Sequence, residues 1–171
     1  MLDTLTMLVP IDQVDARDVE RLLDAAFGTD RHGRTAYRLR EGAVAVPDLS
    51  FAARDSDGRL VGSLQCWPVQ LATPAGDIAP LVLVGPVAVD PAHQRHGLGR
   101  EMMAQMLYAA DASEAPPQVL IGDPEYYGRF FGFTAEATGE WDLPGPFERR
   151  RLLARTGGRL LPPQGMIGPR S

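Results

Sequence analysis

Lysine is absent from this 171-residue chain, and all 17 of its basic residues are arginine. The absence excludes every mechanism that needs a lysine amine: a Schiff base with a carbonyl substrate, an anchor for pyridoxal phosphate, and the lysine of a Walker-type phosphate loop. Any chemistry that this chain performs must therefore use other groups.

Cysteine and histidine are also scarce. Cys66 is the single cysteine, so no disulfide can form within the chain and no cysteine cluster can hold zinc. Of the three histidines, His93 and His96 lie three positions apart, but no third ligand is near them in sequence. We therefore expect no metal site, and we expect Cys66 to be an inert buried thiol on a strand rather than a nucleophile.

An excess of positive charge and long apolar runs are missing as well. The net charge is −5 and the pI about 5.1, whereas sequence-independent binding of nucleic acid needs many clustered cations. The one dense basic run, residues 149–151, is interpreted as a solvated strand face. No run reaches the length of a membrane span, and the first residues lack the pattern of a signal peptide. These features favour a cytoplasmic protein with no nucleic-acid or membrane partner.

Hydrophobic periodicity and turn residues predict a mixed α+β domain over residues 1–156. Residues 157–171 are rich in Gly and Pro, and we expect them to form a tail that packs loosely or reaches a partner. Asp12 is the expected N-cap of the first helix. The expected strands are 4–10, 49–54, 60–72, 80–89, 119–121, 133–137 and 147–154, and the expected helices are 12–27, 34–40, 98–110 and 124–131.

A glycine-containing loop joins the apolar strand 80–89 to the helix that begins near residue 98. Gly97 and Gly99 lie at the point where this helix starts. The first amides of a helix have no intrahelical partner and carry partial positive charge, and glycine leaves them unobstructed. The junction thus predicts an anion site of the size of a phosphate or pyrophosphate. The alternative is that the two glycines only shape a tight turn.

Two other phosphate-binding loops do not fit this junction. A P-loop needs Gly-Lys-Ser or Gly-Lys-Thr, and the chain has no lysine. The dinucleotide fingerprint needs a third glycine where this chain has Met102, and it follows the first strand of its unit rather than a later one.

The same run resembles the Gln/Arg-x-x-Gly-x-Gly/Ala signature of the GNAT N-acetyltransferase superfamily. It reads Gln94-Arg95-His96-Gly97-Leu98-Gly99. The resemblance implies that the amides of this loop bind the pyrophosphate of coenzyme A, and that the backbone of Val87, Ala88 and Val89 pairs with the pantetheine arm. Arg100 either contacts a coenzyme phosphate or is solvated.

The resemblance covers nearly the whole chain, because the expected element order matches that fold. It implies the GNAT (acyl-CoA N-acyltransferase) fold, with a mixed, mostly antiparallel sheet of six to seven strands and about four helices. The fourth and fifth strands of this fold splay apart, and the acyl-CoA threads the gap.

A second block, residues 121–133, is similar to the strand-helix-Gly-Phe segment of the YhbS-like branch. Members of that branch carry on this helix a Tyr that serves as general acid to the leaving thiolate, which implies this role for Tyr127, with Tyr126 as the alternative. Tyr127 lies five residues before Gly132 rather than the usual four, which leaves open which tyrosine faces the sulfur. Both could instead simply pack at the helix end.

The general base is not evident. Many members of the family use a Glu on the fourth strand, but this chain has Gly85-Pro86-Val87 there. Asp123 is one candidate, against a role as helix cap before Pro124. His32 and Glu41 are weaker candidates, in a region that usually shapes the acceptor pocket in this family.

The resemblance implies an N-acetyltransferase that moves an acetyl group from acetyl-CoA to a primary amine by direct attack. The acceptor would be a small amine, an amino acid or a peptide N-terminus. A non-catalytic acyl-CoA-binding sensor is the alternative, because the strand Glu is missing and the Tyr register is shifted. Pairing through the last strands is common in the family, so a homodimer is also an expectation.

Overall fold

The computed structural model describes residues 6–170, apart from the side chains of Gln94, Arg95 and His96. The described chain falls into two compact units. The first contains residues 6–32, 45–66 and 85–114, and the second contains residues 33–44, 67–84 and 115–170. The long strands β3 (Leu60–Ala72) and β4 (Ile78–Val89) continue from one unit into the other.

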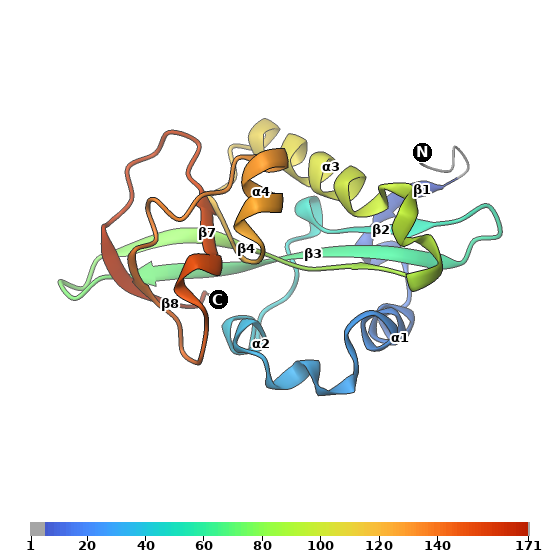
Figure 1. Ribbon diagram of the computed structural model, residues 1–171, viewed down its shortest axis with the longest axis horizontal. Coiled ribbons are helices and arrows are strands. Elements are labelled where there is room, and N and C mark those ends of the chain that lie inside the picture. Colours follow the sequence, from blue (N-terminus) through green and yellow to red (C-terminus); the bar gives the residue numbers. More distant parts are fainter. Residues whose placement is uncertain (1–5, 171) are drawn as a thin grey trace. The chain divides into compact units, whose positions relative to one another are not determined.

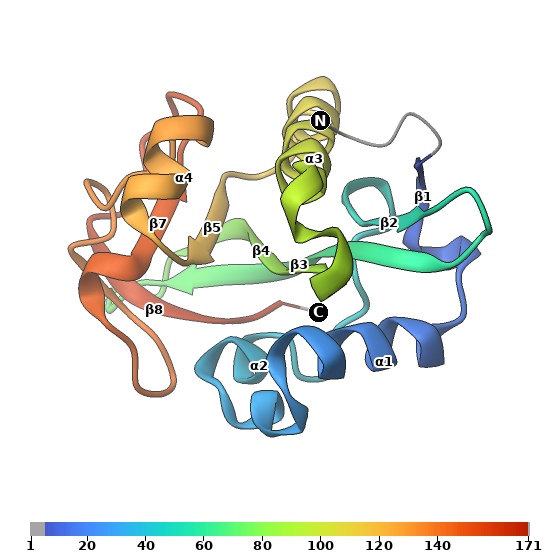
Figure 2. The ribbon, with the colours of Figure 1, turned by 45° about the vertical axis from the view of Figure 1, so that its right-hand side comes forward.

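The first unit is built on antiparallel pairing of β1 (Met7–Pro10), β2 (Phe51–Arg54) and the first half of β3. Helices α1 (Ala16–Phe27) and α3 (Leu98–Ala112) cover opposite faces of β3, as Figure 2 shows. On one face, Val19, Leu22 and Leu23 of α1 form a buried cluster with Ala88 of β4. On the other face, Leu98 and Met102 of α3 pack against Gly62, where the lack of a side chain lets the helix lie close.

The second unit contains the parallel pair of the sheet. Val82 and Leu83 of β4 pair with Gln118 and Val119 of β5 (Gln118–Ile121), and β5 pairs antiparallel with β7 (Leu152–Arg155). Helix α4 (Pro124–Phe131) follows β5, and α2 (Thr35–Leu39) contacts β8 (Gln164–Pro169). Figure 1 shows β8 running along the second half of β3, with which it pairs.

The expected α+β class with its mixed sheet and four α-helices is confirmed for residues 6–170. The hydrogen-bonded order is β1-β2-β3-β4-β5-β7, and β8 pairs with both β3 and β6 (Glu140–Asp142). This makes eight strands among the described residues rather than six to seven. The additional strands β6 and β8 are short and contain or border Gly and Pro, which hides them from a search for alternating apolar residues.

Several local expectations differ from the structure. The expected strand 133–137 is only an isolated bridge between Thr134 and Ala154. The expected loose tail contains β8, whose Ile167 is fully buried. The run 149–151 is a short 3-10 helix rather than a strand face. Arg149 in it donates to the carbonyl oxygens of Thr138, Gly139 and Trp141, so this arginine stabilises the fold.

Candidate active site

The junction between β4 and α3 lies within the first unit, and its own hydrogen bonds fix its path. The backbone N–H of Asp90 donates to Val61 O at 2.8 Å, which holds the end of β4 against β3. The Asp90 carboxylate then accepts from Ala92 N–H at 2.9 Å and caps the 3-10 helix Pro91–His96. The chain leaves β4 through an ordered turn and enters α3 at Leu98.

Gly97 is the residue that redirects the chain into α3. Its φ of 70° and ψ of 18° place it in the left-handed region, which a glycine adopts without strain. It is exposed, and a Cβ built on it would meet nothing within 4 Å. Gly97 is also the N-cap of α3, and it has no side chain that could hydrogen-bond to the first amides of the helix. The N-cap position therefore leaves exposed backbone at the positive end of this helix.

Leu98 and Gly99 complete the first turn of α3. Leu98 is buried against the position of Gly62 on β3 and anchors the helix end on the sheet. Gly99 is half-buried, and a Cβ on it would lie 3.7 Å from Val89 Cγ2, an ordinary van der Waals contact. The structure thus brings Val89, Gly97, Leu98 and Gly99 together around one helix end.

The remaining predicted cofactor residues lie along the same segment. Val87 and Val89 are half-buried on β4, whereas Ala88 is buried and packs against α1. Arg100 is exposed on the first turn of α3. The backbone of Gln94, Arg95 and His96 belongs to the 3-10 helix, and their side chains lie outside the described part of the chain.

Helix α4 in the second unit carries the three predicted catalytic residues. Asp123 is its N-cap, and the carboxylate accepts from Glu125 N–H at 3.0 Å. The Tyr127 ring is seated against Gly122, where an added Cβ would lie 2.5 Å from Tyr127 Cε2. Tyr126 meets Tyr127 edge to face, with ring centroids 4.9 Å apart. The shared helix places all three within one segment, and only Tyr127 contacts Gly122 in this way.

The surroundings of Tyr127 and Asp123 shift their pKa values in opposite directions. Burial, and then the neighbouring Tyr126, raise the pKa of Tyr127 above its usual value near 10, against a smaller lowering effect of Arg151. The pKa of Asp123 is lowered, chiefly by a side-chain hydrogen bond with Glu125 and further by backbone N–H groups. At neutral pH, Tyr127 is a protonated donor and Asp123 is an ionised carboxylate.

Cys66 is fully buried, and burial raises the pKa of its thiol. A thiol that stays protonated is a poor nucleophile, in agreement with the expected inert role. Among residues 6–170, no group of three or more His, Cys, Asp or Glu side chains is arranged to hold a metal ion. None of the helices described is both long and apolar enough to cross a bilayer.

Two polar side chains of β3 were not among the predicted site residues. Ser63 and Gln65 lie two positions apart in a strand that is otherwise largely apolar. That interruption of an apolar strand by two polar residues on one face is the sequence signal that could have marked them.

Comparisons with known proteins agree with this fold. The family described as "Acetyltransferase (GNAT) domain" matches residues 9–135. The Escherichia coli K12 protein named "Uncharacterized N-acetyltransferase YhbS" is 29% identical over 132 residues, which cover 77% of this chain and 75% of that protein.

Two solved structures share the fold over nearly the whole chain. Escherichia coli YhbS, a GNAT family N-acetyltransferase solved in complex with CoA, has a TM-score of 0.72 at 24% identity and covers 98% of this chain and 90% of its own. A GNAT family acetyltransferase from Brucella melitensis, in complex with acetyl-CoA, has a TM-score of 0.70 at 25% identity and covers 95% and 94%.

The architecture, together with a family match over well over half of the chain, defines the class as acyltransferase. The chain belongs to the GNAT acetyltransferase family, and the expected likeness to its YhbS-like branch is confirmed.

Proposed function

We propose that this protein transfers an acetyl group from acetyl-CoA to a primary amine by direct attack of the amine on the thioester. The observation that carries the proposal is the exposed, left-handed Gly97 at the start of α3, where the N-cap residue has no side chain. The Brucella melitensis structure in complex with acetyl-CoA and the YhbS structure in complex with CoA support the same cosubstrate here.

The first unit supplies the groups that would hold acetyl-CoA. The backbone amides of the segment Gln94–Gly99 would bind the pyrophosphate, because a helix start combines N–H donors with partial positive charge. Val87, Ala88 and Val89 would present backbone groups to the pantetheine arm, and Arg100 would add a cation for a phosphate. The open space at Gly97 and the moderate packing at Gly99 fit a ligand that approaches bare backbone.

The reaction needs one group that donates a proton to the leaving sulfur and one that accepts a proton from the amine nitrogen. When the amine nitrogen bonds to the carbonyl carbon, the carbon–sulfur bond breaks and the sulfur leaves with the electron pair. Tyr127, with its raised pKa, donates a proton to that sulfur, and Tyr126 is the alternative donor. The nitrogen releases its proton to water, and water returns a proton to the phenolate of Tyr127, so the proton count closes. The lowered pKa of Asp123 makes its carboxylate a weak base, so its part would be to pass the amine proton on through water rather than to take it from the amine and keep it.

A thiol-release assay over a panel of primary amines tests the proposal. The panel contains small amines, amino acids and peptides with free N-termini, and the product is identified by mass spectrometry. We expect release of free coenzyme A that depends on one class of amine and yields the acetylated amine. Binding of acetyl-CoA without thiol release from any amine would instead identify an acyl-CoA-binding sensor.

A further inference from the structure

Two buried polar atoms on β3 have no hydrogen-bond partner among the described residues. They are Ser63 Oγ and Gln65 Oε1. Ser63 is fully buried, whereas Gln65 retains some exposed surface. A buried oxygen without a donor destabilises a folded chain, and native proteins rarely keep one without a role. Two such atoms, two residues apart on one strand face, are both explained by one ligand that brings N–H or O–H donors.

The strand register shows which face carries the pair. Asp90 N–H donates to Val61 O, and antiparallel pairing then sets Ser63 opposite Ala88. Ala88 packs against α1, so Ser63 and Gln65 lie on the face of β3 that α1 covers. Gly62, the residue before Ser63, faces α3 instead. The pair therefore lies next to β4 residue Ala88, on the side away from α3.

We propose that Gln65 and Ser63 bind the amine of the acetyl acceptor, with Gln65 as a specificity-determining residue. This inference rests on the proposed function. The Gln65 carboxamide oxygen and the Ser63 hydroxyl oxygen each accept one N–H, which leaves the nitrogen lone pair available to attack. Both groups are neutral, so neither favours the ammonium form as a carboxylate would. An acceptor with a carboxylate or phosphate at this position would leave the Gln65 oxygen unpaired.

Three variants separate this role from a structural one. Gln65→Met keeps the length of the side chain but removes the carboxamide, and Ser63→Ala removes only the hydroxyl. Gln65→Glu keeps an acceptor oxygen at the same position. Gln70→Met is the matched control, because Gln70 is a half-buried glutamine of the same strand that belongs to the second unit, outside the proposed amine site.

The measurements are KM and kcat for the best amine of the panel, the Kd of acetyl-CoA by calorimetry, and the melting temperature without ligand. For Gln65→Met we expect KM for the amine to rise roughly tenfold, with kcat and the acetyl-CoA Kd changed by less than about twofold. Gln65→Glu restores most of the affinity. Ser63→Ala raises KM and leaves the melting temperature equal or higher, because the hydroxyl has no partner to lose.

The outcomes distinguish the inference from the function on which it rests. If the unmodified protein acetylates amines but Gln65→Met changes KM no more than Gln70→Met does, the inference is wrong and the proposed function stands. A fall in the melting temperature of Ser63→Ala would show a structural hydroxyl and would also overturn the inference. If the unmodified protein acetylates no amine, the proposed function fails and this inference fails with it.

Discussion

Tyr127 is the side chain on which the proposed acid catalysis depends. Its ring contacts Gly122 on one side and meets Phe133 edge to face, with ring centroids 6.3 Å apart. These apolar neighbours raise the pKa of its phenol, since burial disfavours the charged form. A protonated phenol in a fixed orientation is what a leaving thiolate requires from a general acid.

Replacing Tyr127 by Phe should lower kcat by roughly 100-fold, because it removes the proton donor while keeping the ring. The acetyl-CoA Kd should stay the same. Because the pKa of Tyr127 lies above 10, its ionisation should cause no loss of kcat between pH 7 and pH 9, and a loss should appear only above pH 10. The measurement is kcat across pH for both proteins.

Tyr126→Phe is the matched control, from the adjacent position of the same helix. We expect it to change kcat by less than about threefold. If Tyr126→Phe rather than Tyr127→Phe abolished activity, the roles of the two tyrosines would be reversed.

The close contact between Gly122 and the Tyr127 ring leaves no room for a side chain at residue 122. In Gly122→Ala, the new Cβ would lie 2.5 Å from Cε2 and 2.9 Å from Cδ2 of Tyr127, so the ring must move. We expect a loss of kcat of roughly tenfold or more, because a displaced phenol no longer reaches the sulfur. Gly139→Ala is the control, since a Cβ there meets nothing within 4 Å. Normal kcat in Gly122→Ala would show that the position of the ring is unimportant.

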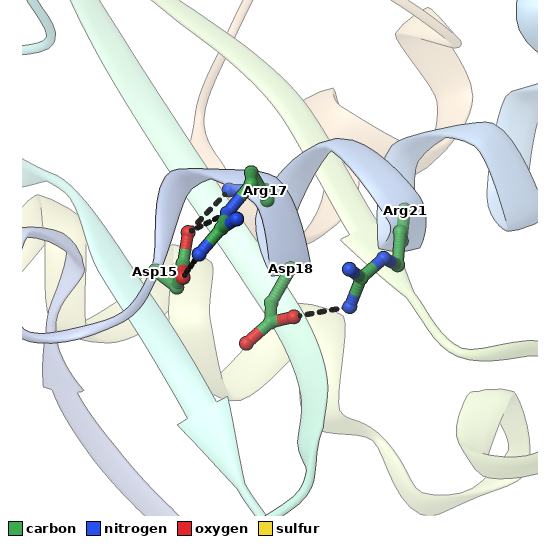
Figure 3. Close-up of polar contacts among 4 residues, drawn as sticks. All are labelled: Asp15, Arg17, Asp18 and Arg21. Atoms are coloured by element: carbon green, nitrogen blue, oxygen red, sulfur yellow. Dashed lines mark hydrogen bonds and ion pairs between the residues drawn. The ribbon is translucent and has the colours of Figure 1, made fainter.

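Among the elements, helix α1 begins later than hydrophobic periodicity predicts. Periodicity predicted a helix from residue 12 with Asp12 as its cap, but Asp12 belongs to a short 3-10 turn and Asp15 is the cap. Figure 3 shows the Asp15 carboxylate accepting from the backbone N–H and the guanidinium of Arg17, and Asp18 paired with Arg21. Both aspartates precede the apolar stripe, so periodicity alone could not choose between them.

Asp15→Ala should lower the melting temperature at neutral pH by a few degrees, because the first turn of α1 loses its acceptor. Hydrogen bonds from the Arg17 side chain, and then from its backbone N–H, lower the pKa of Asp15 below 3.8. The stabilisation is therefore present above pH 3.8 and is lost as the pH falls through the lowered pKa.

Thermal melts of Asp15→Ala, of the control Asp12→Ala and of the unmodified protein, each taken at neutral and at acid pH, check this prediction. A larger loss in Asp12→Ala than in Asp15→Ala would mean that α1 begins at the earlier residue.

Elements with a strong local pattern could be predicted from the sequence, and those held by partners distant in sequence could not. The strand 60–72 and the helix 124–131 match β3 and α4 residue for residue. By contrast, β6 contains the single apolar residue Trp141, and it exists because it pairs with β8. Such pairing leaves no periodicity in a strand of this length.

The residues of the candidate site likewise divide into those that a local sequence pattern predicts and those that it does not. The loop around Gly97 could be predicted because a strand, a loop and a helix start are contiguous in sequence. The pair Ser63 and Gln65 was missed, since only burial and the lack of partners distinguish it from other polar residues. Asp123 was predicted with two alternative roles, and the structure shows that it caps α4.

At the scale of the whole chain, the C-terminal segment is part of the sheet. Strand β8 pairs antiparallel with β3 over the register from Val69 with Pro169 to Ala72 with Met166. Ile167 in the middle of β8 is fully buried, whereas its neighbour Met166 is 46% exposed. The last strand therefore contributes core as well as backbone hydrogen bonds.

Ile167→Ala should destabilise the protein by about 2–5 kcal/mol, the usual range for a large apolar side chain removed from a packed core. Met166→Ala, one residue away and partly exposed, should cost much less. Urea unfolding of both variants provides the comparison. Equal small losses in the two variants would show that residues 164–169 are a dispensable tail rather than a strand of the sheet.

The most direct measurement is a calorimetric titration of acetyl-CoA into the unmodified protein, Gly99→Val and Ala104→Val. Valine at residue 99 places two methyl groups at the helix start where the pyrophosphate would lie, and Gly99 has ordinary packing that tolerates a Cβ. Ala104 is exposed further along α3 and receives the same kind of side chain. We expect the unmodified protein and Ala104→Val to bind equally, and Gly99→Val to bind roughly tenfold more weakly or worse with an unchanged melting temperature. Equal affinity in all three proteins, or no heat with the unmodified protein, would contradict a coenzyme site at the start of α3.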